Sequence, residues 1–328
     1  MPWRVSPQAR KDGQQPNPYH IWLSEVMLQQ TTVAAVRDYF VKFTTTWPHI
    51  HDLAASDDAE VMAAWAGLGY YARARNLLKC ARIVTRDHNG RFPEEEQALL
   101  KLPGIGPYTA AAIAAIAFDR RAVVLDGNVE RVMARLENEH SPLPRSKELL
   151  RGYADHHTPD ERAGDYAQAV MDLGATICTP KSPSCDICPI KEDCKAQAKG
   201  TAATLPRKDP RKEKPTRYGH AYVACSPAGD VFLIRRPDKG LLGGMLAWPS
   251  TEWLEEQPAQ APPFPADWQE LKQVVRHTFT HFHLILTVHH VITPDEGEMT
   301  QRRDFHPSAL PTVMRKVWNA VEKEIEKR

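Results

Sequence analysis

The sequence predicts a multidomain protein in which a mostly α-helical domain is followed by a smaller α+β domain. Its 328 residues are enough for two packed cores, because one domain commonly takes about 150 residues. From Pro18 to about Ala198 the chain is rich in alanine and places apolar residues at three- and four-residue steps, which is the helical period. Beyond His220, short apolar runs between turn residues replace that pattern and predict strands.

A basic, proline-containing segment separates the two patterns. Its cations outnumber its acidic residues, and they are Lys199, Arg207, Lys208, Arg211, Lys212, Lys214 and Arg217. This composition is typical of a linker, so we expect domains at 1–198 and 218–328 with a linker at 199–217. The strands and the closing helix expected in the second domain are His220–Ala224, Val231–Arg235, Val274–Thr278, His283–Val291 and Thr312–Lys327.

Composition excludes some classes of protein. No run of about 18 apolar residues occurs, and no secretory segment follows Met1, so we expect a cytoplasmic protein that does not enter a membrane. The net charge of +1 lacks the basic bias of many nucleic-acid-binding proteins. Any contact with DNA therefore has to come from local placement of residues.

Cysteine residues gather in one short loop. The spacing leaves six, two and five residues between Cys178, Cys185, Cys188 and Cys194. Four thiolates so close together suit a [4Fe-4S] cluster, and they also suit structural zinc, so the spacing leaves both open. In either case the role is structural. Cys80 and Cys225 are isolated, and we expect them to be small buried side chains.

The segment Leu99–Ala110 predicts two helices joined by a tight turn. Pro103 ends the first helix, and Pro107 suits the first turn of the second. Gly104 and Gly106 allow unusual backbone angles between them. Such a turn leaves backbone N–H groups at a helix N-terminus free to bind a DNA phosphate without reading sequence. An ordinary Pro-Gly turn between helices is the alternative.

Two carboxylic acids have opposite expected environments. On a helix, Glu25 shares a face with Ile21 and Leu28, and apolar surroundings raise a carboxyl pKa toward the range of a general acid. Asp126 opens a helix near Val129, where the helix N-terminus favours its ionised form. Glycosidic bond cleavage uses such a pair, one to protonate the leaving group and one to stabilise an oxocarbenium-like sugar. Considered alone, Glu25 could equally be an ion-pair partner, and Asp126 could equally be a helix cap.

Together these motifs resemble the MutY adenine DNA glycosylases over most of the chain. The matching segments are Ser24–Thr31, Gly67–Tyr71, Pro103–Tyr108, Leu125–Val129 and the cysteine loop. The resemblance implies a helix-hairpin-helix domain with a [4Fe-4S] cluster, and it favours the cluster over zinc. It also implies that Glu25 protonates a flipped adenine at N7. Asp126 would then stabilise the sugar cation and help water to attack.

The resemblance implies that Tyr108 and Asn128 support this site. Bifunctional relatives carry a lysine at the position of Tyr108, and that lysine attacks the sugar as a Schiff-base nucleophile. A phenol cannot form a Schiff base, and the nearest lysine, Lys101, precedes the turn. We therefore expect a monofunctional enzyme that uses water and leaves an abasic site.

Further contacts are implied by the same resemblance. Gln30 and Tyr70 would wedge into the base stack around the oxidised guanine while adenine is flipped out, with Leu28 beside them. The hairpin glycines Gly104 and Gly106 would lie against the DNA backbone. The implied contacts to adenine are Trp3, Arg4 and Gln168.

The second domain resembles the Nudix-like C-terminal domain of that family, which recognises 8-oxoguanine. The segments that match are Leu241–Pro249 and His277–His283. Within the second, the loop Phe279, Thr280 and His281 would read the oxidised base. The family commonly has serine where this chain has Thr280, and the hydroxyl is kept.

Hydrolysis by the second domain is not expected. Nudix hydrolases bind magnesium through an Arg-Glu-x-x-Glu-Glu helix, whereas here Glu252, Glu255 and Glu256 follow Trp248 without that arrangement. The alternating histidines His281 and His283 are expected to pack and hydrogen-bond rather than to bind metal.

The sequence thus predicts a monomeric enzyme of base excision repair that acts on double-stranded DNA containing A:8-oxoguanine or A:G mispairs. One alternative is a glycosylase for thymine or oxidised pyrimidines on the same scaffold. The second domain and Gln29–Thr31 argue against it. The other alternative is a non-catalytic lesion-binding module, against which the pair of Glu25 and Asp126 stands.

Overall fold

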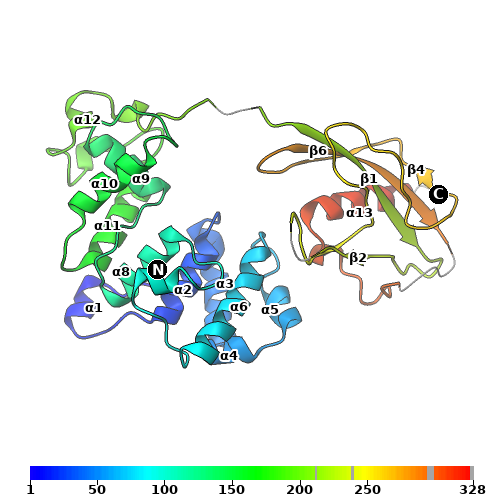
Figure 1. The fold of residues 1–328 in the computed structure, drawn as a ribbon, viewed down its shortest axis with the longest axis horizontal. Helices are drawn as coiled ribbons and strands as arrows, with labels where there is room; N and C mark the ends of the chain where they lie inside the picture. The colour runs from blue at the N-terminus through cyan, green and yellow to red at the C-terminus, as the bar shows by residue number, and fades with distance from the viewer. Residues whose placement is uncertain (211–212, 238–239, 294–298, 326–328) are drawn as a thin grey trace. The chain divides into compact units, whose positions relative to one another are not determined.

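A computed structural model describes residues 1–210, 213–237, 240–293 and 299–325. The chain forms two compact units, Met1–Pro210 and Arg211–Arg328 (Figure 1). The first is helical, and the second combines a small sheet with a helix, which confirms the predicted fold class. Among the described residues, no helix has both the length and the apolar character that a bilayer crossing requires.

The first unit is assembled from helices of four to sixteen residues. Several begin at a polar side chain that accepts from backbone N–H groups, as Asn17, Thr32 and Asp126 do. The helices are α1 Pro7–Lys11, α2 Pro18–Leu28, α3 Val33–Thr46, α4 Ile50–Ala55, α5 Asp58–Ala64, α6 Ala72–Asp87, α7 Glu96–Leu99, α8 Pro107–Phe118, α9 Gly127–Leu136, α10 Lys147–His157, α11 Ala163–Thr176 and α12 Lys195–Ala198, with 3-10 turns at Cys185–Ile187 and Ala202–Thr204.

Helices α2 and α8 form the centre of this unit. Residues 21–27 of α2 and 109–117 of α8 are all buried, and α8 packs against both α2 and α11. Alanines keep α8 thin, so its neighbours come close. A Cβ added to Gly164 of α11 would stand 2.3 Å from the carbonyl oxygen of Ala115. Glu25 therefore lies on a helix that is buried all round, rather than on one apolar face.

The first part of the predicted linker packs against the helical unit. Leu205 is buried, and its carbonyl oxygen accepts a hydrogen bond of 2.9 Å from Nε of Arg135. The backbone N–H of Leu143 donates to the carbonyl oxygen of Arg207 at 2.9 Å. The basic composition of 199–210 predicts a tether, but one buried leucine and a few backbone bonds are enough to hold the segment.

The second part of the predicted linker runs into the sheet. Arg211 and Lys212 lie outside the described residues, and strand β1 already begins at Thr216. The predicted strand at 220–224 is therefore the inner half of a longer strand, Thr216–Cys225.

The long strands β1 and β6 are the main strands of the sheet in the second unit. Strand β6, His283–Ile292, runs parallel to β1, with Thr216 opposite His283 and Cys225 opposite Ile292. Two short strands pair antiparallel with β6, namely β4 Gln269–Glu270 and β5 Val275–Thr278. The strands predicted at 274–278 and 283–291 are confirmed. Of the strand predicted at 231–235, only β2 Ile234–Arg235 forms, paired with β3 Leu246–Ala247.

Helix α13, Thr312–Ile325, covers the core of the second unit (Figure 1). The buried Trp248 donates from Nε1 to the carbonyl oxygen of Met314 at 3.0 Å and stacks on Trp318. This helix confirms the predicted closing helix up to Ile325, and Lys327 lies outside the described residues.

Candidate active site

Glu25 is a buried carboxylic acid in the core of the helical unit. Only 4% of its surface is exposed, and its neighbours Ser24 and Val26 are buried as well. Burial raises the pKa of Glu25 from 4.5 to about 7. The hydrogen bond from Tyr108 and the charge of Arg4 lower that pKa, and the charge of Asp126 raises it. Glu25 can therefore hold a proton near neutral pH, as a general acid must.

Tyr108 holds the carboxyl group of Glu25 in place. Its hydroxyl donates to Oε2 of Glu25 at 2.8 Å from the first turn of α8. Burial raises the pKa of Tyr108, and the charges of Glu25 and Asp126 raise it further. The phenol thus stays protonated and acts as a donor throughout the physiological range.

The turn before Tyr108 places the N-terminus of α8 at the surface. Gly104 has φ +77°, and a Cβ there would stand 2.9 Å from Cβ of Asn76, so glycine is required. Gly106 has φ −96° in extended backbone that any residue adopts, so the predicted special angle at Gly106 is wrong. Both glycines are exposed, and Gly106 caps α8 without a side chain. This N-terminus can accept a phosphate.

Asp126 is at once a helix cap and a member of the site. Its Oδ1 accepts from the backbone N–H groups of Asn128 and Val129 at 2.9 and 2.8 Å. Its Oδ2 accepts from Nδ2 of Asn128 at 3.0 Å. Three N–H donors and the N-terminal end of the α9 dipole thus face the Asp126 carboxyl group. The charge of Asp126 acts on both Glu25 and Tyr108, so the two carboxyl groups share one site.

Arg131 is a residue of this region that sequence reasoning missed. Its Nη2 donates to Oδ1 of Asn128 at 2.8 Å and to the carbonyl oxygen of Gly174 at 2.7 Å. Its Nε donates to the carbonyl oxygen of Cys178 at 2.7 Å. Arg131 thereby orients the amide that faces Asp126. The available signal was a charged residue at a buried position of an otherwise apolar helical pattern.

The three predicted adenine contacts, Trp3, Arg4 and Gln168, have different surroundings in the structure. The charge of Arg4 reaches both Glu25 and Tyr108, and its guanidinium pairs with Asp172. Trp3 is buried and packs edge-on against the aromatic core. Gln168 donates to the carbonyl oxygen of its own helix one turn earlier, at 3.1 Å. Arg4 therefore belongs to the electrostatic environment of Glu25, and the roles of Trp3 and Gln168 stay predictions.

Gln30 and Tyr70 are exposed residues with unusual backbone. Their φ angles are 58° and 49°, in the left-handed region that residues other than glycine rarely adopt. The Tyr70 side chain is 55% exposed, and Leu28 is half-buried at the end of α2. Gln29, which the sequence indicated only as part of the segment Gln29–Thr31, donates from its side-chain amide to the hydroxyl of Thr109 at 3.2 Å. Surface side chains held in this way are suited to enter a DNA stack.

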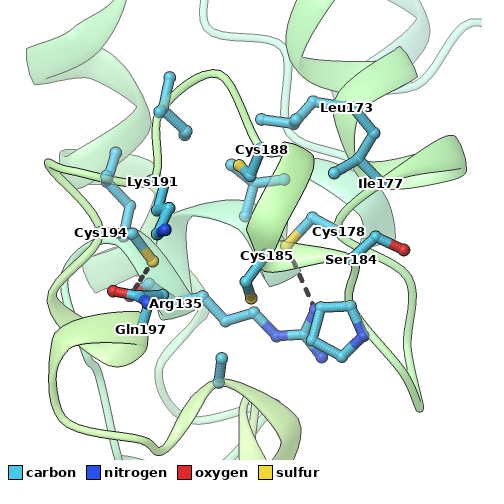
Figure 2. A pocket seen from close by; sticks show the side chains of 15 residues that line it. Arg135, Leu173, Ile177, Cys178, Ser184, Cys185, Cys188, Lys191, Cys194 and Gln197 are labelled. Carbon is cyan, nitrogen blue, oxygen red and sulfur yellow. Dashed lines mark hydrogen bonds between the residues drawn. The ribbon is translucent and has the colours of Figure 1, made fainter.

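Four cysteines line a single cavity, which Figure 2 shows together with Arg135. The Arg135 side chain is almost fully buried, and its Nη1 stands 3.2 Å from Sγ of Cys178 (Figure 2). The thiol of Cys194 lies 3.5 Å from the carbonyl oxygen of Arg135. Four thiols round one cavity, with a cation beside them, fit an anionic iron-sulfur group. When bound, that group cross-links the loop through the thiolates of Cys178, Cys185, Cys188 and Cys194.

The predicted recognition loop lies between β5 and β6 of the second unit. The backbone N–H of Phe279 donates to the carbonyl oxygen of Phe282 at 2.9 Å, and Thr280 and His281 are exposed. The ring of Phe279 stacks on Trp253, with centroids 5.7 Å apart. Of the two histidines expected to pack, His283 bonds to Thr278, whereas His281 is exposed at the tip.

Family models match three stretches of the chain. Residues 23–151 match the HhH-GPD superfamily base excision DNA repair proteins, and residues 178–194 match the iron-sulfur binding domain of endonuclease III. Residues 220–320 match the NUDIX domain. The second match decides between zinc and iron, and the loop holds a [4Fe-4S] cluster.

Solved structures with a similar fold include a thermostable thymine-DNA glycosylase, 29% identical, with a TM-score of 0.52 over 61% of this chain and 88% of that one. A non-covalent complex of endonuclease III with DNA is 26% identical, with a TM-score of 0.50 over 57% of this chain and 87% of that one. Fold and site together define the chain as a DNA N-glycosylase of the helix-hairpin-helix class.

Relatives whose similarity extends over both units identify the family within this class. The human adenine DNA glycosylase is 33% identical over an alignment that covers 98% of this chain and 71% of that protein. The chain belongs to the adenine DNA glycosylase family, and the resemblance seen in its motifs is confirmed.

Proposed function

We propose that the enzyme hydrolyses the N-glycosidic bond of adenine paired with 8-oxoguanine, or with guanine, in double-stranded DNA. One observation carries the proposal. A buried carboxyl group with a pKa of about 7 accepts a hydrogen bond of 2.8 Å from Tyr108 and feels the charge of Asp126. Cleavage of a glycosidic bond uses such a pair, in which a buried carboxylic acid that can donate a proton lies near a second carboxyl group.

The chemistry divides between the two carboxyl groups. Glu25 donates its proton to N7 of a flipped adenine, which makes the base a better leaving group. The bond between C1′ and N9 then breaks, and its electron pair leaves with adenine. Asp126 stabilises the positive charge that develops on the sugar. Water attacks C1′, its proton passes to a carboxylate, and an abasic site remains.

The route through water is supported by the residue after the hairpin. Tyr108 stands where a lysine nucleophile would be needed, and its hydroxyl is engaged with Glu25 at 2.8 Å. Lys101 is exposed, and it precedes the turn in the sequence. Strand cleavage through a Schiff base therefore has no amine at this position.

Recognition of the base opposite adenine is assigned to two groups of residues. Gln30 and Tyr70 of the first unit would enter the stack, and Thr280 at the tip of the β5–β6 loop would bond to the oxidised guanine. The exposure of Thr280 and the packing of the adjacent Phe279 ring on Trp253 support this role.

The test is a single-turnover assay on duplexes with adenine opposite 8-oxoguanine or opposite guanine. We expect faster release opposite 8-oxoguanine, breaks that require alkali, and release at least about a hundredfold slower with Glu25→Gln or Asp126→Asn. Thr280→Val should lower the ratio of the two rate constants about tenfold, the size of one specific base contact, and Thr280→Ser should retain it. Equal rates on both duplexes would refute the preference for 8-oxoguanine. Breaks without alkali would refute the route through water.

A further inference from the structure

Arg73, in the first turn of α6, joins two segments that lie far apart in the sequence. Its Nη1 donates to the carbonyl oxygens of Val26 and Met27 at 3.1 and 2.9 Å, at the end of α2. Its Nη2 donates to the carbonyl oxygens of Leu68 and Gly69 at 3.0 and 3.3 Å. The planar fork of one guanidinium thus ties the end of a helix to a loop about 40 residues later in the chain.

Each tied segment leads within three residues to an exposed residue of left-handed backbone. Gln30 follows the end of α2, and Tyr70 follows Gly69, with φ angles of 58° and 49°. Arg73 also bonds to Thr31, which follows Gln30, and to Tyr70. Its Nη2 donates to the hydroxyl of Thr31 at 3.1 Å, and its backbone N–H donates to the carbonyl oxygen of Tyr70 at 2.8 Å. A strained conformation persists only where its surroundings hold it, and here one residue bonds to Thr31, next to Gln30, and to Tyr70.

Aromatic rings border the same guanidinium. Its central carbon lies 5.5 Å from the ring centre of Tyr70 and 5.3 Å from that of Trp65. Trp65 also donates from Nε1 to the carbonyl oxygen of Gly69 at 3.0 Å. The cation therefore sets the position of the Tyr70 ring as well as of its backbone. A lysine could keep the charge, but it could not reach all these acceptors at once.

We propose that Arg73 is a positioning residue that fixes the spacing of Gln30 and Tyr70, so that the two side chains enter the DNA stack as one unit. The proposal rests on the proposed function, in which these two residues wedge beside the base opposite adenine. Arg73 touches neither the reacting atoms nor the carboxyl pair. Its loss acts on the flipping of adenine, while the chemistry at Glu25 is untouched.

The test compares Arg73→Met, which keeps the stem, and Arg73→Lys, which keeps the charge, with a control. Arg86→Met is a matched control because Arg86 lies at the exposed end of the same helix and pairs with its neighbour Asp87. Two quantities are measured, the single-turnover rate constant for adenine release and the fluorescence of 2-aminopurine in the position of the target adenine. We expect Arg73→Met to slow adenine release about tenfold, which is the usual size of the coupling between contacting residues. The same variant should reduce the gain in 2-aminopurine fluorescence. Arg73→Lys should fall between it and wild type, and Arg86→Met should stay within about twofold.

A double-mutant cycle separates positioning from general support of the fold. In a background of Gln30→Ala and Tyr70→Ala, Arg73→Met should add less than about twofold, because nothing remains for it to position. Full slowing in that background, or unchanged flipping in both single variants, overturns the proposal. If Arg73→Met does not fold, the same cycle with Arg73→Lys decides. Each rate is taken opposite both 8-oxoguanine and guanine, so an enzyme without preference for 8-oxoguanine still reports on Arg73.

Discussion

The hydroxyl of Tyr108 donates a hydrogen bond of 2.8 Å to Oε2 of Glu25, which links the start of α8 to α2. This donor stabilises the carboxylate form and lowers the pKa of Glu25, while burial raises the pKa more strongly, to about 7. The phenol keeps its own proton because burial and two neighbouring carboxylates raise its pKa. Tyr108 therefore tunes Glu25 without exchanging a proton with it.

The rate of adenine release should fall as pH rises through about 7, because the reactive form of Glu25 is the protonated one. Above that value the single-turnover rate constant should drop about tenfold per pH unit. The measurement is a profile from pH 5.5 to 9 with saturating enzyme. A rate constant that stays flat from pH 6 to 9 would contradict the assignment.

Tyr108→Phe should move the basic limb of that profile to higher pH. The substitution removes a donor that favours the carboxylate, so the pKa of Glu25 rises and the acid stays protonated to a higher pH. The ring and its packing remain, so stability should change by only about 1 kcal/mol. A limb displaced to lower pH would mean that the phenol stabilises the acid form instead.

Stability should also report the proton on Glu25. Its pKa is about 7 in the folded chain against 4.5 ordinarily, so the folded state binds more protons between these values. The contribution of this group is fully present below about pH 4.5 and is lost as pH rises through about 7. Relative to Glu25→Gln, wild type should lose on the order of 3 kcal/mol between pH 5 and 8. Urea midpoints of both proteins at the two pH values test this, and parallel curves would refute it.

Asp126→Asn and Asp126→Ala should separate capping from catalysis. Asparagine caps a helix about as well as aspartate, so Asp126→Asn should keep its stability and lose at least about a hundredfold in rate. Asp126→Ala should show the same rate loss and about 1 kcal/mol less stability. Thermal unfolding alongside single-turnover rates distinguishes them. Retained activity in Asp126→Asn would reduce Asp126 to a cap.

Cys185→Ser should remove the cluster and loosen the loop around it. The visible sulfur-to-iron absorbance should disappear, and the melting temperature of the helical unit should fall by several degrees, since about 1 kcal/mol corresponds to 2–4 °C at this size. Cys225→Ala is the control, because Cys225 is a buried thiol of the second unit. Equal cluster content in both variants would exclude Cys185 as a ligand.

Local patterns carried most of the prediction. Helical periodicity predicted α2 and α9, the turn before Pro107 predicted the start of α8, and strand-like runs predicted β5 and β6, because those patterns depend on neighbours in the sequence. The same periodicity placed Glu25 among apolar residues, and the structure buries it with 4% exposed. The motifs, rather than the periodicity, then related Glu25 to Asp126 across a hundred residues of chain.

Contacts between distant segments escaped prediction. Arg131 and Arg135 bind carbonyl oxygens more than 40 residues away, and no local pattern announces such partners. Leu205 was hidden for the same reason, because one apolar residue in a basic stretch does not look like an anchor. Gly106 shows the reverse error, since a glycine in a turn need not use its freedom.

The buried alanines of α8 bear on how natural variants of this chain should be interpreted. Single-base changes readily convert alanine codons to valine or threonine, and each adds bulk where residues 109–117 are all buried. Overpacking of this kind commonly costs about 1–3 kcal/mol. A carrier of such a change at Ala111 or Ala115 would have intact catalytic residues and yet too little folded enzyme. Its loss of adenine excision would be one that no inspection of the catalytic motifs would foresee.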